Sequence, residues 1–493
     1  MSFKEITLPE IDQVMMASQE AFLAYRKING AAKAAFLEAI ASEIEMIGDG
    51  LIHKAMQETN LPEARLQGER GRTCNQLRQF AALVKEGSWV EARIDTAIPD
   101  RAPLPKPDLR KMQVPLGPVV VFGASNFPFA YSTAGVDTVS ALAAGCPVIL
   151  KGHPAHAETS ELVAGAIARA MTKTGMPINT FLHVQGASFE VGKALVQHPV
   201  TKAVGFTGSF SGGKALYDYA CQRPDPIPVF SEMGSINPVF ILPGALKVRG
   251  EKVAEQYAAS ITQSVGQFCT NPGLMLGLQS NELDEFTLQL AEKMKKIAPG
   301  TMLHPGIAVN YNKNRAKALA QKGVSLAAES ADAAKANQGV PTLASVNASE
   351  FLSNPTLFEE VFGPYSLLVK ATTMEELKAA VRRIPGQLTA TIIGEEDELL
   401  EQTDFIQLVM EKAGRVIING VPTGVEVCPS MHHGGPFPAT TDSRFTSVGI
   451  DAIKRFVRPV SFQNFPDALL PAELKQSNPL GIWRLFNNEL VRK

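Results

Sequence analysis

Apolar residues over positions 10–95 recur at spacings of three and four, which is the pattern of amphipathic helices. Glycines interrupt the pattern, so it predicts several helices rather than one long helix. Prolines and charges then follow one another closely in "DRAPLPKPDLRKM" (100–112). This composition predicts an exposed arm or connector, not a central strand.

From position 118 the pattern changes to short β-branched runs, each ending near a glycine and each followed by a helical period. Four such strand-then-helix units follow one another, over 118–145, 147–175, 180–198 and 203–222. This alternation predicts a parallel, doubly wound sheet. Such sheets bind ligands at the carboxyl ends of their strands, where the glycines lie in this chain.

A second α/β pattern begins at "NPVFILPG" (237–244) and continues to "GRVIING" (414–420). It predicts a second domain at about 234–455. The tail from 456 mixes β-type residues with prolines, and it could return to the first domain or cover a neighbouring subunit.

Composition narrows the class of protein. Of 493 residues, 45% are hydrophobic and 19% are charged, enough to bury a sizeable core, and the net charge of -2 argues against nucleic-acid binding. The charge-free stretch between Lys111 and Asp137 is interrupted by prolines, so we interpret it as a buried strand, a loop and a helix, not a membrane span. The N-terminal residues do not resemble a signal peptide. Five scattered cysteines suit a reducing compartment, and we expect a cytoplasmic protein.

Three residues are candidates for catalysis. Cys269 lies among small and polar residues in "SVGQFCTNPG", unlike Cys146 in its apolar run, and it could be either reactive or inert. Glu232 follows a β-type run inside a glycine turn, where it is either a solvated turn acid or a general base. Asn126 follows a buried strand, and its amide could donate a hydrogen bond to an oxyanion, although Asn is also common in turns.

Other residues suggest a phosphate or ribose site. The turn "FTGSFSGG" precedes a predicted helix whose N-terminus suits a phosphate, but it matches no strict phosphate-loop motif. Lys151 ends another strand, where it could hold a ribose or simply extend along the surface. The histidine spacing fits no zinc motif, so we expect no metal site.

Taken in order, these segments resemble the aldehyde dehydrogenase superfamily. The matching segments are "ASNFPF" (124–129), "LKGHPA" (150–155), "FTGSFSGG" (206–213), "SEMGS" (231–235), "GQFCTNPG" (266–273) and "EEVFGP" (359–364). The resemblance implies an α/β fold with a Rossmann-type sheet and a second catalytic domain. It implies a dinucleotide-binding domain of 1–98 and 113–233, a catalytic domain of 234–455, and an oligomerisation arm and tail of 99–112 and 456–493.

The resemblance also assigns roles by position. Cys269 would be the nucleophile, Glu232 the base, and Asn126 would form the oxyanion hole with the backbone N–H of Cys269. The residues expected to hold the cofactor are Lys151, His153, Gly208, Ser209, Gly213, Gly234, Glu360 and Phe362. The weaker substrate candidates are Phe127, Phe129, Phe268 and Arg444.

Two departures from the family pattern bear on specificity. Ser125 stands where members of the family often have Trp, which reshapes the pocket. Pro154 stands where NAD-preferring members often have Glu, so we expect NADP, with NAD possible. The resemblance is strongest to a bacterial branch of α-ketoglutaric semialdehyde (2,5-dioxovalerate) and fatty aldehyde dehydrogenases.

The expected activity is therefore oxidation of α-ketoglutaric semialdehyde to 2-oxoglutarate in sugar acid or hydroxyproline catabolism. The alternatives are a long-chain fatty aldehyde dehydrogenase and, in another class, a cysteine thiol esterase without a nucleotide. A homodimer or homotetramer is expected, with no nucleic-acid or membrane partner.

Overall fold

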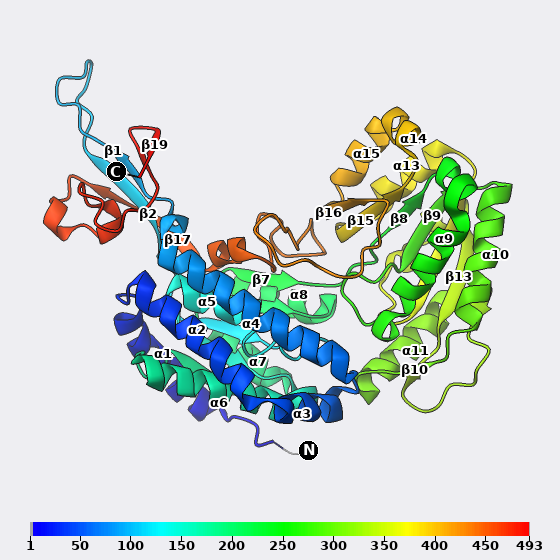
Figure 1. Cartoon of the computed structure of the whole chain (residues 1–493), viewed down its shortest axis with the longest axis horizontal. Coiled ribbons are helices and arrows are strands. Elements are labelled where there is room, and N and C mark those ends of the chain that lie inside the picture. Colours follow the sequence, from blue (N-terminus) through cyan, green and yellow to red (C-terminus); the bar gives the residue numbers. More distant parts are fainter. Residues whose placement is uncertain (1–2, 493) are drawn as a thin grey trace.

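The chain forms two α/β bodies and a small β-structure that projects from one of them (Figure 1). The computed structural model describes residues 3–492. The helices predicted over 10–95 are confirmed as α1 (Leu8–Tyr25), α2 (Gly30–Ile47), α3 (Asp49–Thr59) and α4 (Glu63–Glu86). Thr7 caps α1 with a capping box, and Asn29 caps α2 through its side chain.

The first body contains a five-stranded sheet in the order β5-β4-β3-β6-β7, and every neighbouring pair is parallel. The four predicted strand-then-helix units are confirmed. The strands are β3 (Val119–Phe122), β4 (Val148–Lys151), β5 (Phe181–Val184), β6 (Ala203–Thr207) and β7 (Val229–Glu232), and the helices are α5 (Val136–Ala144), α6 (Ala157–Thr174), α7 (Phe189–Gln197) and α8 (Phe210–Cys221). The strand order reverses between β3 and β6, which is where doubly wound sheets bind ligands.

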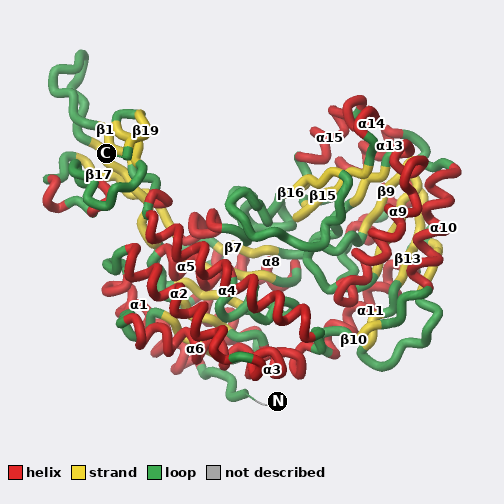
Figure 2. Tube along the Cα trace, in the orientation of Figure 1, coloured by secondary structure: helices red, strands yellow, loops and turns green. Residues whose placement is uncertain are grey.

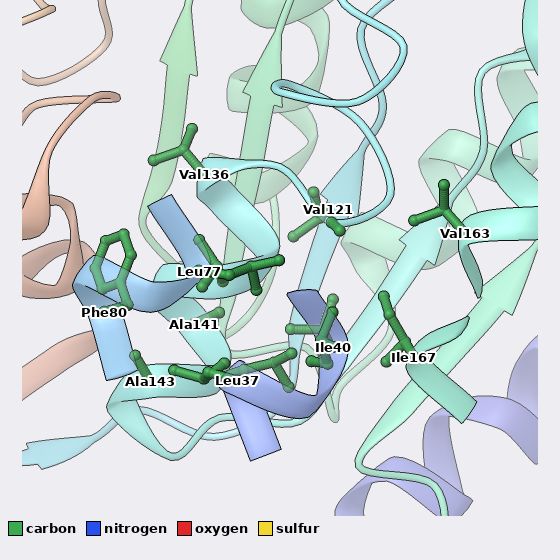
Figure 3. Packing of buried hydrophobic residues seen from close by; sticks show 14 of the residues in the cluster. Leu37, Ile40, Leu77, Phe80, Val121, Val136, Ala141, Ala143, Val163 and Ile167 are labelled. Carbon is green, nitrogen blue, oxygen red and sulfur yellow. The ribbon is translucent and has the colours of Figure 1, made fainter. Parts of the chain in front are cut away.

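Apolar side chains from α2, α4, α5, α6 and β3 form the main core of this body (Figure 3). Leu37, Ile40, Leu77 and Phe80 come from the two long helices and are 0–1% exposed. The stretch without charges is the buried strand β3, a loop and the helix α5, as predicted, and all nine residues of α5 are buried. This packing fixes the loop after β3, which carries Asn126.

The second body contains a seven-stranded sheet in the order β11-β13-β14-β9-β8-β15-β16, parallel except for the edge strand β11. Its strands are β8 (Val239–Ile241), β9 (Leu274–Leu278), β11 (Ser325–Glu329), β13 (Thr342–Asn347), β14 (Tyr365–Ala371), β15 (Gln387–Ile393) and β16 (Ala413–Ile418). Its helices are α9 (Pro243–Thr262), α10 (Asn281–Lys295), α11 (Pro305–Leu319), α12 (Ala348–Ser353), α13 (Met374–Arg383), α14 (Glu396–Glu401) and α15 (Thr403–Met410), and β10 (Gly300–Thr301) pairs with β12 (Gln338–Gly339). The second α/β pattern in the sequence corresponds to this sheet.

The projecting β-structure joins two distant parts of the chain (Figure 2). Its sheet has the order β17-β2-β1-β18-β19, formed by β1 (Arg93–Asp95), β2 (Leu109–Pro115), β17 (Val457–Gln463), β18 (Arg484–Phe486) and β19 (Glu489–Val491). The tail therefore pairs with the arm, while the division into three domains stays a prediction. Within 3–492, no helix combines the length and apolar character that crossing a bilayer requires.

Candidate active site

Four of the predicted site residues follow neighbouring strands of the first sheet at the same edge. Lys151 ends β4, Asn126 lies in the loop after β3, Ser209 follows β6, and Glu232 ends β7. Because carboxyl ends of parallel strands lie on one side of a sheet, the topology gathers these residues. After Glu232 the chain crosses into β8 of the second body, so this edge faces the junction between the bodies.

Cys269, His433 and Glu232 form a cluster that we call the catalytic trio. The Cys269 Sγ lies 3.4 Å from the His433 Nε2, and that nitrogen lies 3.0 Å from the Glu232 Oε1. Ser447 donates a hydrogen bond to the other oxygen of the Glu232 carboxylate. His433 and Glu232 are buried, whereas Cys269 is partly exposed. A nucleophile, a base and an orienting hydroxyl are thus in contact.

The charges of the trio depend on one another. Burial alone would raise the pKa of Glu232, but the charge of His433 and the hydrogen bonds from His433 and Ser447 outweigh it and lower that pKa. Burial and the nearby Glu232 charge raise the pKa of the Cys269 thiol well above its ordinary value. The site therefore favours a neutral thiol beside an ionised carboxylate, the state in which the carboxylate can accept the thiol proton.

The same three side chains could also bind a metal, because their ligand atoms lie within 4.8 Å of one another. They are the only such group of three among the described residues. Their mutual hydrogen bonds already provide a path for a proton, so no metal is needed to explain the arrangement. The residues His153 and His156, by contrast, stack 5.4 Å apart after β4 and lie outside the trio.

The loop that carries Cys269 is held from both sides. Buried Asn237 donates hydrogen bonds of 2.9 Å to the backbone carbonyls of Cys269 and Asn271. Before the loop, Ser264, Val265 and Gly266 all have positive φ values, of 46°, 57° and 64°. A Cβ on Gly266 would lie 2.3 Å from the carbonyl carbon of Gly363, so only glycine fits there. The nucleophile is presented on a strained, tightly packed turn.

Asn126 lies next to this loop, as an oxyanion donor should. Its Nδ2 donates to the backbone carbonyl of Gln267 at 3.2 Å, two residues before Cys269. An amide nitrogen carries two hydrogens, so the second remains for another acceptor. The backbone carbonyl of Asn126 accepts a hydrogen bond of 2.7 Å from the Nη2 of Arg65, which fixes the loop.

The residues expected around a ribose and a phosphate lie at the edge of the first sheet. Burial lowers the pKa of Lys151 to about 8, against the raising effect of the Glu5 charge. His153 is partly buried, and burial holds its pKa well below the ordinary value. Pro154 begins a short 3₁₀ helix (Pro154–His156) here, so no carboxylate occupies that position.

The glycine turn leads into α8. Ser209 caps this helix by accepting a hydrogen bond of 3.2 Å from the Gly212 backbone N–H. The Gly208 backbone N–H donates to the Glu232 carbonyl at 3.0 Å, so the turn is tied to the catalytic strand. A Cβ on Gly213 would lie 2.7 Å from the side chain of Met233. Glycine at 213 therefore lets α8 pack closely on the end of β7. Ser209 and Ser211 at the helix N-terminus are exposed, which suits an anionic group.

Glu360 faces the first body from the second. It accepts a hydrogen bond of 3.3 Å from the Ser235 backbone N–H, and burial raises its pKa to about 7. A Cβ on Gly234 would lie 2.6 Å from its carboxylate. Glu360, Phe362 and Phe268 line a hollow that opens to solvent. A lysine at the end of β4, an exposed helix N-terminus and a carboxylate beside a hollow fit the ribose and phosphate groups of a dinucleotide.

The chain matches a known protein family and curated members of it. The model of the aldehyde dehydrogenase family matches residues 1–445. The chain belongs to the aldehyde dehydrogenase family. It is 51% identical to "Alpha-ketoglutaric semialdehyde dehydrogenase 2" of Azospirillum brasilense, covering 97% of this chain and 91% of that protein. It is 48% identical to the "Alpha-ketoglutaric semialdehyde dehydrogenase" of Acinetobacter baylyi, covering 99% and 93%.

Solved structures agree on the fold. The NADP-dependent glyceraldehyde-3-phosphate dehydrogenase of Bacillus halodurans, complexed with NADP, superposes with a TM-score of 0.79 at 19% identity, covering 94% of this chain and 92% of that chain. An NADP-dependent enzyme of E. coli gives 0.78 at 21% identity, covering 94% and 91%. The predicted family, the aldehyde-oxidising class and the fold are confirmed.

The four residues predicted to bind the substrate of this aldehyde dehydrogenase do not all lie together. Phe127 and Phe268 contact each other edge to face at 5.6 Å, beside the nucleophile loop. Phe129 is 1% exposed and belongs to the main core. Arg444 projects outward with 79% of its side chain exposed, and it pairs with Asp442. The structure therefore leaves Arg444 outside the hollow that Phe268 lines.

The sequence pattern does not predict His433 or Ser447 as members of the site. His433 lies 164 residues after Cys269, in the loop that returns from β16, so no local spacing links the two. The sequence around His433 indicates the site only weakly, through the polar segment "MHHGG" in a stretch without helix or strand periodicity.

Proposed function

We propose that this chain oxidises α-ketoglutaric semialdehyde to 2-oxoglutarate and that it uses NADP in preference to NAD. The contact of Cys269 with His433 and Glu232 is the observation that carries the chemistry. The two relatives that share about half of its residues support the substrate, because both bear that substrate in their names.

The thiol is activated inside the trio. Glu232 is ionised and accepts the proton of the Cys269 thiol, either directly or through the His433 imidazole, whose Nε2 lies between them. The thiolate then forms a bond to the aldehyde carbon, and the carbonyl π electrons move to its oxygen. The result is a thiohemiacetal on Cys269.

The oxyanion of this intermediate needs donors. Asn126 supplies its free amide hydrogen, and the backbone N–H of Cys269 supplies a second. Asn237 holds the Cys269 carbonyl, so Cys269 is fixed from its C-terminal side. The Asn126 amide is positioned by its hydrogen bond to the Gln267 carbonyl before the aldehyde binds.

Lys151, the α8 N-terminus at Ser209 and Glu360 would hold the NADP, which when bound would supply the hydride acceptor. Loss of hydride from the thiohemiacetal carbon leaves a thioester on Cys269. After the thiol proton has passed from Glu232 to solvent, Glu232 removes a proton from an attacking water molecule, and the thioester C–S bond breaks with its electron pair moving to sulfur, which releases the acid. Glu232 then returns its proton to the Cys269 thiolate.

The preference for NADP rests on the edge of the first sheet. A carboxylate that binds the 2′-hydroxyl would repel a 2′-phosphate, and Pro154 occupies the position where such an acid is expected. Lys151 and His153 lie beside it as groups able to contact a phosphate. Saturation curves with NADP and NAD at one fixed aldehyde concentration test this part.

The decisive experiment follows the reduced nicotinamide with a panel of aldehydes. We expect the highest kcat/KM with 2,5-dioxopentanoate, a burst of reduced cofactor, and loss of that burst in Cys269→Ala. A higher kcat/KM with decanal would favour the fatty aldehyde alternative. Hydrolysis of a thiol ester that needs Cys269, without any oxidation of aldehydes, would favour the esterase class.

We also propose that copies of the chain associate through the arm and tail. Their sheet leaves large apolar side chains exposed, namely Ile98, Leu104, Leu469, Trp483 and Leu490, at 44–71%. Patches of this kind mark protein–protein contacts. Sedimentation equilibrium should give a dimer or tetramer for the whole chain and a shift toward monomer in Leu104→Glu combined with Leu469→Glu.

A further inference from the structure

Two arginines of α4 lie against the aromatic wall of the active site. Arg65 and Arg72 are seven residues apart, which places them on the same face of the helix. Their guanidinium carbons lie 4.8 Å and 5.9 Å from the ring centre of Phe127. Two cations therefore flank one aromatic ring that itself contacts Phe268, the residue before the nucleophile.

Both arginines touch the catalytic surroundings directly. Arg65 also lies 4.8 Å from the ring centre of Phe268, and its Nη2 bonds to the Asn126 carbonyl. The Nη2 of Arg72 lies 3.5 Å from the hydroxyl of Tyr131, whose ring is 6.4 Å from that of His433. The positive charge of Arg72 also lowers the pKa of Cys269, against the larger raising effect of burial.

Glu69 lies between the two arginines on α4, and the charges of both lower its pKa, although burial raises it more. Its Oε1 accepts hydrogen bonds from the backbone N–H groups of Phe129 and Ala130, so Glu69 compensates the two cations only in part. The Nη1 of Arg65 and the Nε of Arg72 are buried with no hydrogen-bond partner. Buried cations with spare donors are costly unless an anion binds them.

We infer that Arg65 and Arg72 bind the distal carboxylate of the substrate and so select aldehydes that carry an acid group. This inference rests on the proposed function, which supplies a substrate with a carboxylate at one end and an aldehyde at the other. Arg65 offers a planar donor pair, the geometry that holds a carboxylate in two hydrogen bonds. The carboxylate would compensate the cations, while Phe127 and Phe268 cover the carbon chain between that end and Cys269.

Arg444 serves this purpose poorly. Its guanidinium is bound to Asp442 and is mostly in water, where an ion pair adds little. The α4 pair is partly buried and shares the single carboxylate of Glu69, so it has more to gain from an anion.

Binding of glutarate tests the inference without any turnover. Calorimetry of glutarate with the wild-type protein and NADP should give a measurable Kd. We expect Arg65→Met and Arg72→Met to weaken it by at least about tenfold each, the effect of losing a hydrogen bond to a charged group. Arg78→Met is the matched control, since Arg78 is on the same helix but pairs with Glu45 at the surface. Equal affinities in all four proteins, or no binding by the wild type, would overturn the inference.

Steady-state kinetics distinguish a role of Arg65 in substrate selection from a role in the stability of the protein. The ratio of kcat/KM for 2,5-dioxopentanoate to that for pentanal should fall by about 30-fold in Arg65→Met, chiefly through KM, and should be unchanged in Arg78→Met. If Arg65 had a purely structural role, Arg65→Met would lower kcat/KM equally for both substrates and leave the ratio unchanged. That result would contradict the inference. Arg65→Lys should recover part of the ratio, because it keeps the charge without the planar donor pair.

The two proposals fail differently. A wild-type protein that binds glutarate through these arginines but does not oxidise 2,5-dioxopentanoate contradicts the proposed function only. A wild-type protein that oxidises it, with a ratio insensitive to both arginines, contradicts only the assignment of the carboxylate site.

Discussion

Replacing His433 with Asn tests whether the trio acts as a unit. The substitution removes the imidazole Nε2 that lies 3.4 Å from the Cys269 Sγ and 3.0 Å from the Glu232 Oε1. A hydrogen bond to a charged group contributes about 1.5–3 kcal/mol. Each 1.36 kcal/mol is tenfold in rate, so the loss in kcat/KM should be about 10- to 150-fold.

The pH dependence gives a sharper result. The charge of His433 and its hydrogen bond oppose burial and hold the pKa of Glu232 below its ordinary value. Glu232 must be ionised to accept a proton, so activity falls as the pH drops through that pKa. Without His433 the pKa of Glu232 rises, and the acid limb of kcat/KM must move to higher pH.

The assay is kcat/KM for one aldehyde, measured from about pH 5 to pH 9, with thermal unfolding as a check on the fold. Ser447→Ala is the graded control, because it removes a neutral donor from Glu232 and should shift the limb less. A His433→Asn protein that keeps its rate within about threefold, with an unmoved acid limb, would refute the reasoning.

The remaining predictions concern the loop, the oxyanion, the cofactor and metals. Asn126→Ala should lower kcat by about 10²–10³ with little change in KM for the cofactor, as measured at saturating aldehyde. Gly266→Ala should displace the nucleophile loop from Gly363 and cost about 10² in kcat, while circular dichroism stays the same. Pro154→Glu should lower kcat/KM for NADP more than for NAD, in parallel assays of both cofactors. Zinc at micromolar concentration should inhibit the wild-type enzyme through the trio's sulfur, nitrogen and oxygen atoms, and a chelator should reverse the inhibition. Equal zinc affinity of the wild type and Cys269→Ser, measured by calorimetry, would contradict this site.

Much of the fold follows from local pattern. The strand-then-helix alternation over 118–222 predicts the parallel sheet, because each unit buries its own apolar residues. The motifs around Cys269 and Glu232 could also be found, because they lie in a short loop and at a strand end. The pairing of β17 with β2 does not follow, since it joins Val457 to Pro115 across most of the chain. His433 was missed for the same reason: its role depends on where a long loop returns.

The structure also divides the trio between its two bodies. The loop that carries His433 is bound to the end of β7, through Met233 N–H to the Ala439 carbonyl at 2.8 Å and Thr441 N–H to the Ser231 carbonyl at 3.1 Å. Glu232 and His433 therefore form a base that is assembled on the first body. Cys269 lies in the loop before β9 of the second body. Movement of the two bodies relative to each other therefore changes the distance from the Cys269 Sγ to His433 and Glu232 most. A ligand that draws the two bodies together also brings the thiol closer to its proton acceptor.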